Sequence, residues 1–321
     1  MPQDSSSIVD AYLGSTIPTP PKGFRSGFVG IVGRPNVGKS TLMNYLVGEK
    51  VAITSPVAQT TRNRLRGILS TPQAQIIFVD TPGIHKPHHE LGRVLVKNAQ
   101  MAISSVDVTL FVVDGSTPAG RGDAFIANLV SKSDVPVVLG VNKIDQQPTE
   151  PDKVALIGQS YETLAQAHGW PVVKFSALTG DGLKSLQRML IERLEVGPYY
   201  YPPDLITDQP ERFIMGELIR EQVLLNTREE VPHSVAIAID RVEEDEKITR
   251  ILATVHVERD SQKGILIGKQ GSMMKTISSA AREQMQKLIA GKVYLEIFVK
   301  VQPRWRQSRM HLAEFGYRVD E

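Results

Sequence analysis

A glycine-rich segment near the start of the chain constrains the fold more than any other feature. Residues 33–40 read GRPNVGKS and stand between a predicted buried strand at 28–32 and a predicted helix at 39–47. Glycines let backbone N–H groups close around phosphates, and the N-terminus of the following helix favours negative charge. The segment therefore predicts a strand–loop–helix unit with a phosphate-binding loop, rather than a chance glycine-rich turn.

Composition limits the remaining possibilities. The 321 residues, 41% of them apolar and 22% charged, are enough for about two soluble domains. The absence of Cys excludes disulfides, thiolate zinc sites and thiol nucleophiles, and it fits a cytoplasmic protein in a reducing environment. No apolar run approaches the ~18 residues of a membrane-spanning helix. Residues 1–24, with clustered Ser and Pro, are predicted to be a disordered leader.

The hydrophobic pattern of residues 25–195 alternates strands with helices. Strands are predicted at 28–32, 67–70, 75–80, 106–114, 135–142 and 172–176, and helices at 39–47, 90–104, 121–131, 151–168 and 182–194. This order predicts an α/β domain with a mostly parallel sheet and helices on both faces. Segment 196–209, which contains GPYYYPP, is interpreted as a stiff linker, and a second domain is predicted over 210–321.

Four short motifs, each at the end of a predicted strand, indicate a guanine nucleotide. The phosphate loop comes first, DTPG at 80–83 second, NKID at 142–145 third and SAL at 176–178 last. The Asp145 carboxylate can accept both N1–H and N2–H₂ of guanine, a donor pair that adenine lacks. Asn142 would hold the purine edge, Lys143 would pack over the base and ribose, and the 176–178 segment would offer a backbone N–H to the base O6. The predicted nucleotide contacts are Gly33, Arg34, Pro35, Asn36, Val37, Gly38, Lys39, Ser40, Thr41, Asp80, Thr81, Pro82, Gly83, Asn142, Lys143, Asp145, Ser176, Ala177 and Leu178.

Several of these residues are candidates for the chemistry at the γ-phosphate. Lys39 can reach the β and γ phosphates, and the Gly83 N–H can approach the γ-phosphate. Ser40 can ligate Mg²⁺ directly, and Asp80 can hold it through water. A polar loop at 58–62 supplies Thr61 as the predicted third ligand, with Thr60 as the alternative. The candidate catalytic residues are Lys39, Asn36, Thr61 and Gly83.

The residue after the 80–83 motif is Ile84, which cannot orient an attacking water, so slow intrinsic hydrolysis is predicted. Asn36 is well placed to hold a monovalent cation against the phosphates, and stabilising the turn of the loop is its alternative role. Segment 84–89 is predicted to be a second mobile loop. Its three histidines suggest a metal but lack carboxylate or Cys partners, so a solvated loop is favoured.

The second domain has a sharp internal charge split. Residues 211–260 carry 7 Lys/Arg against 12 Asp/Glu, net −5, whereas residues 262–309 carry 10 against 2, net +8. A concentrated basic half within a folded pattern indicates a polyanionic partner, either nucleic acid or an anionic membrane surface.

A second glycine loop lies in this basic half. The segment Gly264 to Gly271 ends in GKQG, with an apolar helix end before it and an amphipathic helix at 272–289 after it. This arrangement brings backbone amides against single-stranded RNA; a helix-turn-helix used only for packing is the alternative. The predicted RNA contacts are Gly264, Ile267, Gly268, Lys269, Gln270, Gly271 and Lys275. Further on, Trp305 between two arginines could stack a base, but a Trp that anchors a helix at 302–312 is favoured.

The full set of motifs resembles the Era family of bacterial GTPases over residues 25 to about 318. The resemblance rests on the phosphate loop, QTTR at 59–62, the DTPG, NKID and SAL segments, and the helix-strand-strand-helix-helix-strand order of a type II KH domain. The leader departs from the family's compact start, so the resemblance implies nothing for residues 1–24.

The resemblance implies an Era-type GTPase domain over 25–195 that hydrolyses GTP with Mg²⁺, followed by the KH domain. It further implies GTP-favoured binding of the 3′ end of small-subunit rRNA, a role in maturation of the 30S ribosomal subunit, and peripheral association with the inner face of the cell membrane by a monomer. It supports K⁺ as the cation on Asn36, since related GTPases with Asn there use one. Two alternatives remain: an RNA-binding module with a structural GTP site, and a GTP-dependent membrane-surface protein. The Gly268 loop argues against the second, because attraction to lipid needs charge but no glycines.

Overall fold

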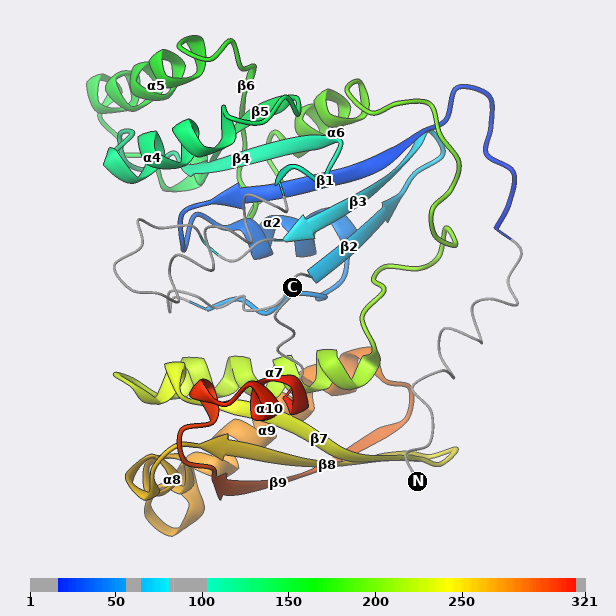
Figure 1. Ribbon diagram of the computed structural model, residues 1–321, viewed down its shortest axis with the longest axis vertical. Coiled ribbons are helices and arrows are strands. Elements are labelled where there is room, and N and C mark those ends of the chain that lie inside the picture. The colour runs from blue at the N-terminus through cyan, green and yellow to red at the C-terminus, as the bar shows by residue number, and fades with distance from the viewer. Residues whose placement is uncertain (1–16, 56–64, 81–82, 84–102, 316–321) are drawn as a thin grey trace. The chain divides into compact units, whose positions relative to one another are not determined.

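The computed structural model describes residues 17–55, 65–80, 83 and 103–315 (Figure 1). The chain divides into two compact units: the first unit comprises residues 1–52 and 64–208, and the second unit comprises residues 53–63 and 209–321. Among the described residues, no helix combines the length and the apolar character that crossing a membrane requires.

The first unit is built on a six-stranded sheet with the strand order β2-β3-β1-β4-β5-β6. Every pairing in it is parallel except that of β2 with β3, which confirms the predicted mostly parallel sheet. The strands are β1 (Arg25–Gly33), β2 (Leu65–Ser70), β3 (Ala74–Asp80), β4 (Val108–Asp114), β5 (Val137–Asn142) and β6 (Val172–Lys174).

Helices cover both faces of this sheet. They are α2 (Lys39–Val47), α4 (Arg121–Val130), α5 (Pro151–Gln166) and α6 (Leu183–Ile191), with a short 3₁₀ turn η1 (Ile144–Gln146). Residues of α4 and α5 share one hydrophobic cluster with β4 and β5, and Figure 1 shows α2 on the opposite side of the sheet. The predicted helix at 90–104 lies almost entirely outside the described residues.

The last strand is shorter than the predicted 172–176. It ends at Lys174, because Ser176 turns the chain: its N–H donates to Asp181 O at 2.9 Å and its hydroxyl accepts from the Thr179 N–H at 3.0 Å. This turn places Ser176 and the two residues after it at the carboxyl end of the sheet, where ligands bind in open parallel sheets.

The segment after α6 is fixed along β2 and β3. Gln75, fully buried in β3, accepts from the N–H groups of Tyr200 and Tyr201 at 2.8 and 3.0 Å. Further on, the Ile68 N–H donates to Ile206 O at 2.8 Å. Residues 196–208 therefore pack as part of the first unit instead of spanning open solvent.

The second unit combines helices with a three-stranded sheet of order β7-β8-β9, in which β7 and β8 are antiparallel and β8 and β9 parallel. Thr54, which belongs to this unit, donates its N–H to the buried Glu221 carboxylate at 2.8 Å. The elements are α7 (Glu211–Asn226), η2 (Val231–His233), β7 (Ala236–Glu244), β8 (Ile248–Val257), α8 (Asp260–Ile267), η3 (Lys269–Gly271), α9 (Ser272–Leu288), β9 (Lys292–Val301), η4 (Trp305–Gln307) and α10 (Arg309–Glu314).

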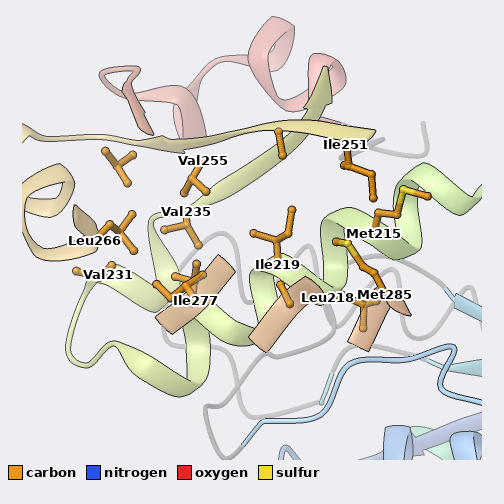
Figure 2. Packing of buried hydrophobic residues seen from close by; sticks show 14 of the residues in the cluster. Met215, Leu218, Ile219, Val231, Val235, Ile251, Val255, Leu266, Ile277 and Met285 are labelled. Atoms are coloured by element: carbon orange, nitrogen blue, oxygen red, sulfur yellow. The ribbon is translucent and has the colours of Figure 1, made fainter. Parts of the chain in front are cut away.

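The core of the second unit lies between the helices and one face of its sheet. Figure 2 shows Ile219 of α7 and Ile277 of α9 among the buried side chains that include Ile251 and Val255 of β8. The observed helix-strand-strand-helix-helix-strand order agrees with the predicted one.

The predicted continuous helix at 302–312 is wrong. Arg304 has a left-handed φ of 54°, and the chain then makes the 3₁₀ turn η4 and a separate helix, α10. Ser308 divides them because its hydroxyl accepts the His311 N–H at 3.3 Å and so caps a new helix. Trp305 is 2% exposed and its Nε1 donates to Ser234 O at 3.0 Å, which favours the anchoring role over base stacking.

Candidate functional site

The phosphate loop folds around a buried lysine. β1 ends at Gly33 and α2 begins at Lys39, whose Nζ donates to the carbonyls of Gly33 at 3.3 Å and Arg34 at 3.0 Å. Burial lowers the pKa of the Lys39 ammonium, and the Asp80 carboxylate opposes that shift. An ammonium group at the centre of a backbone loop is suited to phosphate oxygens.

A hydroxyl and a carboxylate meet at the start of α2. Ser40 Oγ donates to Asp80 Oδ2 at 2.9 Å, and Asp80 is the last residue of β3. These are hard oxygen donors of the kind that Mg²⁺ prefers. Gly83 lies against the loop, where an added Cβ would be 2.9 Å from Pro35 Cα. The other predicted residues of this region, Thr60, Thr61, Thr81 and Pro82, lie outside the described residues.

Asn142 joins three loops that are far apart in the sequence. Its Nδ2 donates to Val37 O at 2.8 Å, and its Oδ1 accepts the Ala177 N–H at 2.9 Å. Gly38 has a left-handed φ of 96°, and an added Cβ would lie 2.3 Å from Asn142 Nδ2. Glycine at position 38 is thus required both by its conformation and by this close approach.

The two other polar residues of the NKID segment differ in their environment. Asp145 is exposed, and no partner for its carboxylate occurs among the described residues. Lys143 adopts a φ of 65°, and its Nζ lies 2.6 Å from Asp114 Oδ2. Burial alone would raise the pKa of Asp114, but hydrogen bonds from Lys143 and Ser116 more than offset this and lower it.

The structure also reveals partners that were not predicted from the sequence. Asp114 holds Lys143, and Asp123 in the first turn of α4 holds Arg34, with Asp123 Oδ2 at 3.1 Å from Arg34 Nη1. The available signal for Asp114 was an acidic residue at the end of a buried strand beside β5.

In the last motif, residues 176–178, the Ala177 N–H donates to Asn142 Oδ1, and Leu178 is 69% exposed.

The second glycine loop exposes its polar side chains to solvent. Gly268, Gln270 and Gly271 have φ values of 70°, 53° and 78°, and the side chains of Lys269 and Gln270 are exposed. At Gly268 an added Cβ would lie 2.7 Å from Met273 Cβ, so a side chain there would collide with α9.

Exposed basic and apolar residues flank this loop. Lys275 is exposed in the first turn of α9, and Gly264 is exposed in α8. Ile267 is 37% exposed, and the neighbouring Ile265, which was not predicted, is 50% exposed. The surface beside the loop is therefore both basic and partly apolar, which suits phosphates and bases together.

No group of three or more His, Asp or Glu residues suited to a metal occurs within the part of the chain that the structure describes. The histidines at 85, 88 and 89 lie outside that part, so the structure does not test the predicted solvated loop.

Comparison with known proteins identifies the family. Residues 28–143 match a family described as 50S ribosome-binding GTPase, and residues 230–306 match the KH domain. The protein named GTPase Era from Nostoc sp. is 73% identical, over 98% of this chain and 97% of its own. GTPase Era from Synechocystis sp. is 68% identical, over 96% of this chain and 97% of its own. This chain belongs to the Era family of GTPases.

Solved structures of Era agree with the fold. One, described as Era in complex with MgGDPNP and nucleotides 1506–1542 of 16S ribosomal RNA, has a TM-score of 0.84 and 37% identity, covering 92% of this chain and 99% of its own. Aquifex aeolicus Era bound to GDP·AlF₄⁻ gives the same values. The predicted architecture of an Era-type GTPase domain followed by a KH domain is therefore confirmed, as is the assignment of the chain as a GTPase.

Proposed function

We propose that this chain is a GTP-hydrolysing switch that binds the 3′ end of small-subunit rRNA and acts in maturation of the 30S ribosomal subunit. The observation that carries the proposal is that one Era-family chain contains both an exposed carboxylate at Asp145 and an exposed glycine loop at 268–271. The Era structure with MgGDPNP and 16S ribosomal RNA supports both halves of it.

Within this proposal the phosphate loop binds and orients the nucleotide. Lys39 contacts the β and γ phosphates, and Gly83 presents its N–H to the γ-phosphate. Ser40 and Asp80 would hold Mg²⁺, with Thr61 as a third ligand and Thr60 as its alternative; the 2.9 Å pair of Ser40 and Asp80 oxygens supports this. When bound, Mg²⁺ neutralises charge on the phosphates.

Asn36 would bind K⁺ beside the phosphates. Its exposure supports this role, whereas its left-handed φ of 63° fits the alternative role of stabilising the turn. Ile84 offers no group that orients water, so we expect slow hydrolysis unless a cation or a partner supplies the missing charge.

RNA would lie along the glycine loop and the start of α9. The Gly268 and Gly271 N–H groups donate to Gly264 O and Gly268 O, so the backbone amides of Lys269 and Gln270 would face phosphates. Lys269 and Lys275 would add positive charge, and Ile267 an apolar contact. Exposure of both lysines supports this arrangement. The family resemblance further supports a cytoplasmic monomer that associates peripherally with the cell membrane.

Titration of a GTP analogue with and without saturating single-stranded RNA tests the switch. If GTP favours the RNA-competent form, RNA must tighten binding of the analogue by the same factor, typically about 5- to 150-fold in allosteric systems. Equal affinities in both titrations would leave two independent binding sites on one chain.

Two further measurements separate the alternatives. Steady multiple-turnover phosphate release would exclude a purely structural GTP site. Vesicles of anionic lipid, added without RNA, would tighten analogue binding only if the membrane surface were the coupled partner.

A further inference from the structure

The first turn of α4 holds a side chain of the phosphate loop. Asp123 is buried, with 1% of its side chain exposed, and its Oδ2 lies 3.1 Å from Arg34 Nη1. The same oxygen accepts the Gly120 N–H at 2.9 Å. One carboxylate therefore caps a helix and binds a loop residue 89 positions away in the sequence.

The location of this pair is electrostatically unusual. The N-terminus of a helix carries partial positive charge, which disfavours a guanidinium, and the Asp123 carboxylate offsets this repulsion of Arg34. Gly122 leaves the necessary room, since an added Cβ would lie 3.0 Å from Arg34 Cδ and 3.1 Å from Nε. Two α4 residues, one through its charge and one through its lack of a side chain, thus accommodate the same arginine.

The backbone of Arg34 points to the phosphate site. Its carbonyl accepts from Lys39 Nζ at 3.0 Å. Because the guanidinium and the carbonyl belong to one residue, fixing the side chain on α4 restricts rotation of the peptide that orients Lys39. We infer that Asp123 is a positioning residue for the phosphate loop and acts through Arg34. The inference rests on the proposed function and adds this residue to it.

This role differs kinetically from a catalytic one. An arginine that neutralises transition-state charge contributes about 10³- to 10⁵-fold to kcat. A residue that shapes the phosphate loop affects binding of substrate and transition state alike, so its loss raises KM at nearly constant kcat. A residue needed only for folding lowers the active fraction, and thereby the apparent kcat, without changing KM.

Steady-state GTP hydrolysis by the full chain tests the inference with Arg34→Met, Asp123→Asn and the double variant. Arg34→Met leaves the buried Asp123 carboxylate without its partner, whereas the double variant leaves no unpaired charge. We expect KM for GTP to rise by roughly 10-fold in all three, with kcat within about twofold of wild type. The thermal unfolding midpoint should be higher in the double variant than in Arg34→Met. Asp152→Asn, an exposed acid in the first turn of α5, is the matched control and should change none of these values.

Other outcomes overturn the inference. If the double variant regains both stability and the wild-type KM, or if KM is unchanged throughout, Asp123 serves folding alone. If kcat falls about 10³-fold at constant KM, Arg34 is itself catalytic. Failure of the wild-type chain to hydrolyse GTP would refute the proposed function instead, so the two failures are distinguishable.

Discussion

The two glycine loops of this protein begin helices in similar ways but present their chemistry differently. In the phosphate loop, Lys39 and the neighbouring Asn142 are buried and hydrogen-bonded to backbone groups. In the 268–271 loop, Lys269 and Gln270 are exposed to solvent. The first loop is built from buried polar groups that are paired with one another, and the second exposes its polar side chains to solvent.

The difference predicts different responses to mutation. A pocket with buried polar partners penalises any ligand or substitution that leaves those partners unpaired. An exposed loop tolerates neutral changes, because water replaces a lost contact, but it does not tolerate a reversal of charge facing a polyanion. The following predictions test this contrast, from the largest expected effect to the smallest.

The largest effect is expected at the base site. Asp145→Asn places a donor against the two guanine donors, so GTP affinity should fall by about 100-fold or more, since polar groups that lose water on binding and stay unpaired cost about 1–3 kcal/mol each. Affinity for xanthosine triphosphate should rise. Competition binding measures both, with Asp152→Asn as a control. Unchanged GTP affinity would remove Asp145 from base recognition.

Charge reversal in the 268–271 loop should weaken RNA binding without changing GTP affinity. Lys269→Asp combined with Gln270→Asp should weaken single-stranded RNA binding by about 100-fold, because two carboxylates would face phosphates. GTP affinity should stay at the wild-type value. Lys247→Asp, an exposed residue between β7 and β8, reverses charge away from the loop and is the control. RNA affinity lost equally in that control would mean that the loop has no special role. The neutral pair Lys269→Gln and Gln270→Ala should cost far less.

The K⁺ ion that we propose for Asn36 should have an intermediate effect on the rate of hydrolysis. Hydrolysis in KCl should exceed that in NaCl of equal ionic strength by on the order of 10-fold, about 1.4 kcal/mol of barrier. Asn36→Ala should abolish the difference while leaving RNA binding intact. Equal rates in the two salts would leave Asn36 with its turn-stabilising role, and a partner would have to supply the missing charge.

A small pH effect should be confined to the second unit. Burial lowers the pKa of His256 below its ordinary value of 6.5, with Lys300 and His311 acting in the same direction and Asp240 and Glu314 opposing. The unfolded chain therefore takes up a proton at higher pH than the folded one. This contribution to stability is complete above pH 6.5 and is lost as the pH falls from there through the lower folded-state pKa.

Thermal unfolding of wild type and His256→Gln between pH 7.5 and pH 5 measures the contribution of His256 to stability. The unfolding midpoint of the wild type should fall by a few degrees more than that of the variant, as expected for a stability change of about 1 kcal/mol or less. Nucleotide affinity should not follow the same profile. Parallel curves for the two proteins would show that His256 is not the titrating group.

The site was predictable from sequence to the extent that its geometry is local. The 33–40 and 268–271 segments carry their own turn residues, so the positions of both loops and of the helices after them agree with prediction. The role of Asp145 toward guanine stays a prediction, which rests on the chemistry of the carboxylate alone. The broken helix after β9 was not predictable, because the decisive event is the capping of α10 by Ser308 within a pattern that also fits a continuous helix.

The sequence by itself determined the order of the elements, the phosphate loop, the position of the carboxylate proposed to select guanine, and the glycine loop of the KH domain. Tertiary structure alone decided which distant residues contact these motifs. Asn142 is hydrogen-bonded to Val37, 105 positions away; Asp114 is bonded to Lys143, 29 positions away; and Asp123 is bonded to Arg34, 89 positions away. A local motif specifies its own backbone through steric limits on a few dihedral angles. A partner from another strand or helix is specified only once the sheet order β1-β4-β5 brings the strand ends together.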